Sequence, residues 1–169
     1  GTVGRSVNTL RHVLHTSSTA PGSARIERRG RWATVPTKVV VAEDEAIIRM
    51  DLRELLQEEG YEVVGECGRG DEAVRLVREL RPDIALLDIK MPGMDGISAA
   101  REISADRLAA VVLVTAFSQR ELIEEAGDAG VHGYVVKPFE RHDLVPAIEV
   151  AISRFRAESL LVEQVASAE

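Results

Sequence analysis

Short apolar runs alternate with amphipathic stretches along residues 38–153. Five strand-like runs lie at 38–42, 61–67, 83–88, 110–115 and 132–137. Runs rich in valine, isoleucine and leucine are typical of strands buried on both faces of a parallel sheet. Between them apolar residues recur at helical spacing, as in the series Ile48, Leu52, Leu55 and Leu56. The alternation predicts an open, doubly wound α/β domain in which five parallel strands alternate with five helices.

Local signals mark the ends of the first three helices. Gly60 stops the first helix, and the dipeptide Arg81-Pro82 ends the second, because a residue before proline disfavours helical geometry. Asp95 is placed to cap a third helix over 96–103. These signals divide the chain into short elements with short connections, as expected for an α/β domain.

The fourth and fifth helices carry weaker signals. Ser118 and Glu121 form a capping-box pattern at the start of the fourth helix. Pro146 fits the fifth helix if that helix starts near Asp143, because the first-turn N–H groups have no intrahelical partners. We therefore expect the last helix to begin close to Asp143.

Three segments follow from these patterns. Residues 37–153 form the α/β domain, and residues 154–169 extend its last helix, with an apolar seam at Phe155, Val162 and Val165. Residues 1–36 lack sustained periodicity and are rich in Ser, Thr, Gly and Arg, so we interpret them as a disordered tail or an added leader. A transit peptide or a basic arm that contacts a partner are alternatives for this tail.

Charge is distributed unevenly along the 169 residues. Residues 1–36 hold six arginines and one glutamate, a net charge of +5, whereas the rest holds 15 basic and 27 acidic residues, a net charge of −12. The acidic domain is a poor candidate for binding nucleic acid by itself. Cys67 is the only cysteine, which fits a reducing cytoplasm. No apolar stretch approaches 18 residues without a charge, which argues against a membrane span.

Polar side chains stand at the ends of four of the predicted strands. They are the Glu43-Asp44 pair, Asp88, Thr115 and Lys137. Ligands of open α/β sheets collect at the carboxyl ends of the strands. Three carboxylates, a hydroxyl and an ammonium are therefore expected to meet in one crevice.

This set of groups suits a divalent cation and a phosphoryl group. Two carboxylates about 4 Å apart repel by about 4 kcal/mol at an effective dielectric near 20, so the acids need protons or a cation. Mg²⁺ prefers oxygen ligands and keeps several waters. Asp88 is suited to attack phosphorus, Lys137 to neutralise phosphoryl oxygens and Thr115 to donate a hydrogen bond. Ala116 is small enough to leave room for the phosphoryl group, and its N–H can point inward.

Each residue also has a structural alternative. The Glu43-Asp44 pair could cap the first helix, and Asp88 could form an Asx turn. Thr115 could serve only as a strand residue, and Lys137 could be a solvated surface lysine. The four sites are more informative together than singly, because all of them stand at strand ends.

Four motifs carry a family resemblance. VVVAEDE, LLDIKMPGMDG, VLVTAF and YVVKPF stand in this order within residues 38–153. This part of the chain resembles the receiver domain of bacterial two-component response regulators. The resemblance implies a flavodoxin-like (β/α)5 fold with Asp88 as the phosphoacceptor. It also implies a Mg²⁺ site formed by Asp44, Asp88 and the Lys90 carbonyl, with Glu43 supporting the metal through water.

The same resemblance implies how the phosphorylated state is recognised. Thr115 and Lys137 would bind the phosphoryl oxygens, and Lys137-Pro138 would be a cis peptide. Tyr134 stands at the aromatic switch position, whose rotamer follows Thr115. The partner implied is a sensor histidine kinase in the cytoplasm, and the domain is a phosphoacceptor rather than an enzyme with turnover.

Three longer sequence stretches resemble a narrower group of receiver proteins. VVVAEDEAIIRMDLRELLQEEGYEVVGE, TAFSQRELIE and AISRFR resemble actinobacterial regulators that join a receiver to an ANTAR RNA-binding antitermination module. In that family a coiled-coil helix leads from the receiver to the module. Residues 154–169 would be the beginning of this linker, and the ANTAR module is absent from these residues. RNA binding is therefore expected only through a module outside this chain, and the alternative is a receiver that acts with a dimerising tail. Helix 140–169 would be the surface of a homodimer.

Two other functions use the same residues. A haloacid-dehalogenase-like phosphatase also uses a strand-end aspartate, but it needs a second Asp where this chain has Lys90. A binding module that no longer takes phosphate is the other alternative, although all acceptor-site residues are present. Lys90 and Phe117 depart from the commonest receiver pattern. We hypothesise that they slow the loss of phosphate by crowding the approach of water.

Overall fold

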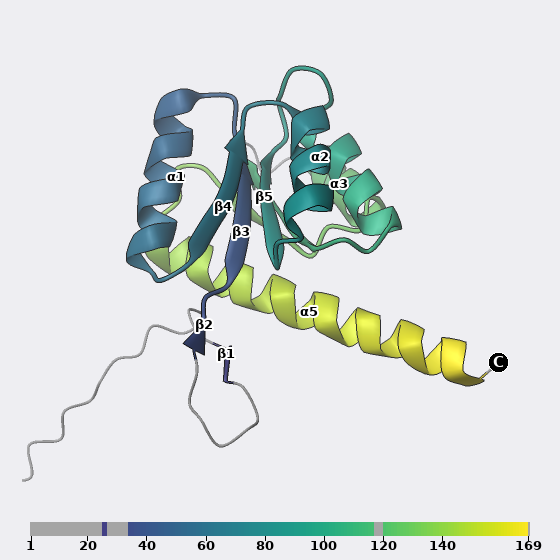
Figure 1. Cartoon of the computed structure of the whole chain (residues 1–169). Helices are drawn as coiled ribbons and strands as arrows, with labels where there is room; N and C mark the ends of the chain where they lie inside the picture. Colours follow the sequence, from purple (N-terminus) through teal and green to yellow (C-terminus); the bar gives the residue numbers. More distant parts are fainter. Residues whose placement is uncertain (1–24, 27–33, 117–119, 169) are drawn as a thin grey trace, which may run out of the picture.

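Five parallel strands form the centre of the structure, a computed structural model that describes residues 25–26, 34–116 and 120–168. The strands are β3 (Lys38–Ala42), β4 (Glu62–Cys67), β5 (Ile84–Asp88), β6 (Ala110–Thr115) and β7 (Gly133–Val136). They pair in the order β4-β3-β5-β6-β7 (Figure 1). The predicted five-stranded parallel sheet is confirmed. Because the chain starts in the middle and builds outward in both directions, the strand order reverses between β3 and β5, where ligands of such sheets bind.

Five helices cover the two faces of this sheet. They are α1 (Ala46–Glu58), α2 (Gly70–Leu80), α3 (Gly96–Ala105), α4 (Arg120–Asp128) and α5 (Arg141–Ala168). Side chains of β3 alternate between the faces, so that Val39 and Val41 pack with α1 and α5, and Val40 packs with α2, α3 and α4. Two apolar cores result, one on each face. Figure 1 shows α1 on one side of the sheet and α2 with α3 on the other.

Most helix boundaries agree with the local signals. Gly60 lies two residues after the end of α1 and Arg81 directly after α2, and both adopt left-handed conformations, with φ of 87° and 47°. The Asp95 side chain accepts a hydrogen bond of 2.7 Å from the Ser98 N–H, which confirms the predicted cap of α3. The Ser118 capping box cannot be compared, because Ser118 lies outside the described residues.

The start of α5 differs from the prediction. The helix begins at Arg141, and the Leu144 N–H donates to the Glu140 carbonyl at 3.1 Å. Pro146 therefore lies in the second turn rather than the first. It has no N–H for the His142 carbonyl, and the helix continues because one missing bond is offset by the burial of Leu144 and Ile148.

Two very short strands lie within the segment that we interpreted as a tail. β1 (Arg25–Ile26) and β2 (Thr34–Val35) pair antiparallel, with Arg25 opposite Val35. The composition of residues 1–36 gave no signal for this pairing. β2 leads directly into β3 through Pro36 and Thr37.

Helix α5 stays attached to the domain beyond residue 153. The buried His132 ring accepts a hydrogen bond at Nδ1 from the Val111 N–H (3.2 Å), and its Nε2 lies 2.9 Å from the Glu158 carboxylate. Its edge meets the Phe155 ring, with centroids 5.6 Å apart. Arg107 donates to the Ser159 hydroxyl at 3.3 Å. The helix is therefore held to the domain as far as Ser159, and its last turns project beyond it (Figure 1).

Candidate functional site

The polar residues singled out at the strand ends meet at one edge of the sheet. Glu43 and Asp44 follow β3, Asp88 ends β5, and Thr115 ends β6. A cavity of about 250 Å³ opens at this edge. It is lined by Asp44, Glu45, Asp88, Ile89, Lys90, Thr115, Ala116 and Lys137. The sheet brings these side chains together because neighbouring parallel strands end in register, with Asp88 opposite Val114 and Thr115 opposite Val136.

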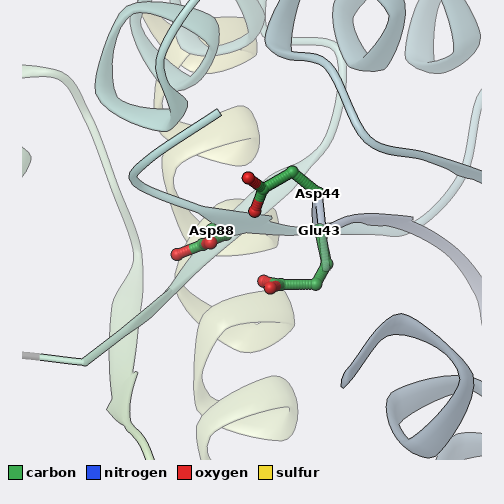
Figure 2. A group of neighbouring side chains, drawn as sticks. All are labelled: Glu43, Asp44 and Asp88. Carbon is green, nitrogen blue, oxygen red and sulfur yellow. The ribbon is translucent and has the colours of Figure 1, made fainter. Parts of the chain in front are cut away.

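Three carboxyl groups cluster at this edge of the sheet. Oxygens of Glu43, Asp44 and Asp88 all lie within 4.8 Å of one another. Figure 2 shows the three side chains converging from the ends of β3 and β5. Glu43 is fully buried and Asp88 is 8% exposed, whereas Asp44 is open to solvent. Asp88 Oδ1 accepts a hydrogen bond of 2.8 Å from the Ile89 N–H, which fixes the orientation of its carboxyl group.

Lys137 supplies the opposite charge. Its Nζ lies 3.1 Å from Glu43 Oε2 and 3.5 Å from Asp88 Oδ2, and the side chain is only 16% exposed. The Lys137 N–H donates to the Thr115 carbonyl at 2.7 Å, which continues the β6–β7 ladder by one residue. The Lys137-Pro138 peptide is cis, as the family resemblance implied. Lys137 is therefore a partly buried cation of the site and not a solvated surface lysine.

Burial shapes the protonation of this cluster. Burial raises the pKa of Glu43 to about 7, and the charge of Asp88 adds to this, while the hydrogen bond from Lys137 opposes it. Burial alone would lower the pKa of Lys137, but the hydrogen bond with Glu43 and the charge of Asp88 outweigh it, so that this pKa is raised. Lys137 thus stays charged, and the cluster favours either a proton on Glu43 or an added cation.

The donor set fits a hard divalent cation. Carboxylate oxygens from two strand ends and an open side of the cavity match the preference of Mg²⁺ for oxygen ligands with retained waters. Charged side chains that line the cavity are Asp44, Glu45, Asp88, Lys90 and Lys137. A cation would relieve the repulsion between the carboxylates.

Three of the four remaining predicted site residues line the cavity, and Tyr134 lies outside it. Thr115 is 7% exposed and lines the cavity, and the exposed Ala116 lies at its mouth. Lys90 also lines the cavity. Tyr134 is 46% exposed and lies outside this cavity, where it lines a separate hollow of about 440 Å³ between α4, β7 and α5. A role for Tyr134 therefore has to be indirect, through β7.

The structure also bears on the structural alternatives. The N-cap of α1 is Glu45, and no side-chain cap is formed there, so the Glu43-Asp44 pair does not cap the helix. The Asp88 carboxyl group accepts a hydrogen bond from the N–H of the next residue, Ile89. In an Asx turn it would accept from the N–H two residues further on. Burial of Asp88 beside Lys137 indicates more than a turn-forming role.

Two residues at the site were not found from sequence. Glu45 lines the cavity as a third acidic residue after β3. Arg49, one turn into α1, donates from Nη1 to the Glu43 carbonyl at 2.7 Å. A basic residue one helical turn after an acidic strand end was the available signal. This signal is weak, because a helix-surface arginine usually points to solvent.

Comparisons with known sequences agree on one family. A family model described as the response regulator receiver domain matches residues 39–149. The transcriptional regulatory protein PdtaR of Mycobacterium tuberculosis is 57% identical over 135 residues, which are 80% of this chain and 66% of PdtaR. The chain thus spans just under two thirds of that relative. The chemotaxis protein CheY of Thermotoga maritima is 40% identical over 66% of this chain and 93% of its own.

Solved structures give the same picture. The receiver domain of the NarL regulator of Mycobacterium tuberculosis has a TM-score of 0.67 and 32% identity, covering 69% of this chain and 96% of its own. The CheX-CheY-BeF3-Mg²⁺ complex of Borrelia burgdorferi has a TM-score of 0.64 and 26% identity, with 68% of this chain covered and 88% of that one. The part of the chain that aligns is the α/β domain.

Proposed function

The chain belongs to the response regulator receiver domain family, and on this premise we propose that Asp88 accepts a phosphoryl group from a sensor histidine kinase. Receiver domains are regulatory phosphoacceptors that interact with histidine kinases. The observation that carries the proposal is the position of Asp88, a buried carboxylate 3.5 Å from Lys137 at the end of β5. Covalent labelling of the chain by a small phosphodonor in the presence of Mg²⁺ tests it.

The chain's own groups account for the chemistry of the transfer. The Ile89 N–H holds Asp88 Oδ1, which leaves Oδ2 to attack the phosphorus atom of a phosphohistidine. A P–O bond forms, the P–N bond breaks, and the electron pair leaves with the imidazole. Lys137 lies on the Oδ2 side, where its ammonium can neutralise phosphoryl oxygens. Thr115 and the Ala116 N–H line the same cavity as hydrogen-bond donors for those oxygens.

Mg²⁺ is the metal that this site would hold. Asp44, Asp88 and the Lys90 carbonyl would be its ligands, with Glu43 acting through water. When bound, it neutralises negative charge on the phosphoryl oxygens during transfer. The acidic cluster supports this assignment, and so does the similarity to a CheY whose complex contains BeF3 and Mg²⁺.

We further propose that phosphorylation changes the face formed by α4, β7 and α5. The added phosphoryl oxygens would draw Thr115 and Lys137 inward, and these two residues end β6 and follow β7. Tyr134 lies in the middle of β7 beside the apolar hollow under α4. A small shift of β7 would therefore alter both the tyrosine rotamer and the hollow, as expected for a two-state switch.

The output would pass along α5. PdtaR is a transcriptional regulator longer than this chain, and the sequence resembles receivers joined to an ANTAR module. We propose that this chain regulates transcription antitermination through such an RNA-binding module beyond its last residue. Within the described residues, no helix has both the length and the apolar character to cross a bilayer.

Helix α5 also offers a surface for a homodimer. Beyond Ser159, Leu160, Leu161, Val162 and Val165 are 47–64% exposed. Leu161 and Val165 lie one turn apart on one face. Replacing both by glutamate should lower self-association of the phosphorylated chain by at least about tenfold, because two charges would enter the apolar contact. Sedimentation equilibrium measures this. Unchanged association would place the contact elsewhere.

Lys90 is expected to protect the phosphoryl group. It lines the acceptor cavity two residues after Asp88, where its long side chain crowds the approach of water. Lys90→Asn should therefore speed the loss of phosphate by about threefold to tenfold, an effect of about 1 kcal/mol on the barrier. The decay of the phosphorylated species after donor removal gives this rate. A variant that loses phosphate no faster than the wild type would contradict the hypothesis. Phe117, the second residue of the hypothesis, lies outside the described residues.

A further inference from the structure

The backbone of Glu43 is held at both of its polar atoms. Its N–H donates to the Cys67 carbonyl of β4 at 2.9 Å, and its carbonyl accepts from Arg49 Nη1 at 2.7 Å. The first bond extends the β3–β4 ladder by one residue. The second comes from α1, so that the strand end and the helix that follows it are joined across the acidic turn.

Arg49 brackets this turn with two of its own groups. Its backbone N–H donates to the Glu45 carbonyl at 2.9 Å in the first turn of α1, while its guanidinium reaches back to the Glu43 carbonyl. The three residues from Glu43 to Glu45 therefore lie between two bonds made by one arginine. Hydrogen bonds to a charged donor are stronger than neutral ones, and this arginine is half-buried.

Gly68 provides the space for this contact. A Cβ built on Gly68 would lie 3.1 Å from Arg49 Nη1, 3.3 Å from the Asp44 Cα and 3.5 Å from the Glu43 carbonyl oxygen. The guanidinium, the acidic turn and the residue after β4 thus pack closely, and a side chain at residue 68 would require its neighbours to shift by a few tenths of an ångström. The arrangement fixes where Asp44 stands relative to the end of β3.

We propose that Arg49 is a positioning residue of the acceptor site, whose guanidinium holds the Glu43–Asp44 backbone so that both carboxyl groups converge on Asp88. This inference rests on the proposed function, because it concerns the metal-binding half of the same site. Arg49 acts on the backbone rather than on the carboxyl charges. The groups that shift the pKa of Glu43 are Lys137 and Asp88, together with burial. Arg49 contacts the carbonyl instead.

Mg²⁺ titration of the unphosphorylated chain by calorimetry tests the proposal. Arg49→Gln should weaken Mg²⁺ binding by about 10-fold to 100-fold, the usual effect of losing a group that orients metal ligands. Arg49→Lys keeps the charge but replaces the planar guanidinium by a single ammonium group. Its Mg²⁺ affinity should lie between those of the wild type and Arg49→Gln. Urea unfolding in EDTA shows for each variant that the domain is folded.

Arg53→Gln is the matched control. Arg53 lies one turn further along α1 and pairs with Glu66 on the surface at 3.2 Å, so that its loss removes the same charge from the same helix. Its Mg²⁺ affinity should stay within about twofold of the wild type, since exposed ion pairs contribute little. Two results would overturn the positioning role. One is a loss of Mg²⁺ affinity in Arg53→Gln equal to that in Arg49→Gln, and the other is wild-type Mg²⁺ affinity in both Arg49→Gln and Arg49→Lys.

The two proposals fail in different ways. A wild-type chain that binds Mg²⁺ but takes no phosphoryl group would overturn the proposed function and leave the Arg49 comparison measurable. A wild-type chain that is phosphorylated, with an Arg49→Gln variant of normal Mg²⁺ affinity, would overturn the positioning role alone. A wild-type chain that does not bind Mg²⁺ would overturn both.

Discussion

Asp88→Asn is expected to abolish the covalent phosphoryl adduct that acetyl phosphate and Mg²⁺ form on the wild-type chain. The amide oxygen of asparagine is a far weaker nucleophile than a carboxylate, so that the P–O bond does not form. The fold should be unaffected, because an asparagine Oδ1 can still accept the hydrogen bond from the Ile89 N–H. Intact mass measures the adduct, as one phosphoryl group per chain in the wild type and none in the variant.

Asp106→Asn is the matched control for this experiment. Asp106 follows α3 and pairs with Arg78 on the surface at 2.6 Å, so the same charge is lost away from the acceptor cavity. It should be labelled like the wild type. An adduct of equal yield on Asp88→Asn would show that another residue accepts the phosphoryl group, and no adduct on the wild type would contradict the proposed function itself.

Gly96→Ala is expected to destabilise the domain by about 1–3 kcal/mol or more, the range for overpacking in a close-packed interior. A Cβ at Gly96 would overlap the carbonyl oxygen of Asp88 and would lie 2.8 Å from the Asp88 carbonyl carbon and 3.0 Å from the Ile89 Cα. All three are backbone atoms at the end of β5, so that no side-chain rotation can relieve the contact. Urea unfolding followed by circular dichroism measures the change in the free energy of unfolding.

The same substitution in α4 provides the control. Among the residues that the structure describes, a Cβ at Gly127 would meet no atom within 4 Å. Gly127→Ala should therefore be neutral or stabilise by up to about 1 kcal/mol, since glycine is a poor helix residue. Two variants with the same effect would show that helix propensity, and not the contact with Asp88, decides the outcome. Because the strained contact lies at Asp88 itself, Gly96→Ala should also slow phosphoryl labelling.

The tertiary structure joins the carboxylate cavity to α5 through one short strand. β7 spans Gly133–Val136, with Lys137 after it in the acceptor cavity and His132 before it against α5. A displacement of Lys137 along this strand would reach the residue that contacts Glu158. This gives the proposed switch a direct route to the part of α5 that leaves the domain.

The sequence determined the five strands and five helices of the α/β domain and their order, but not the short strands β1 and β2. Residues within β3, β5 and β6 are apolar on both faces, because helices cover both sides of the sheet, and that burial is visible as an uninterrupted run. The position of Asp88 at a strand end followed from the same pattern. Local rules also predicted the Asp95 cap, since it depends on residues three apart. The helix α5 begins at Arg141, two residues before the predicted start at Asp143. The local rule for proline failed there, because the burial of Leu144 and Ile148 offsets the hydrogen bond lost at Pro146.

Only the tertiary structure decided which distant groups meet. Lys137 contacts Glu43 across 94 residues, and His132 contacts Glu158 across 26, at distances set by strand order and helix packing. Arg49 turns toward the Glu43 carbonyl because Gly68 leaves space beside it, and no pattern along α1 encodes that space. Periodicity reports whether a residue is buried. The partner of a buried charge depends on which elements become neighbours, and that is fixed by the packing of the whole domain.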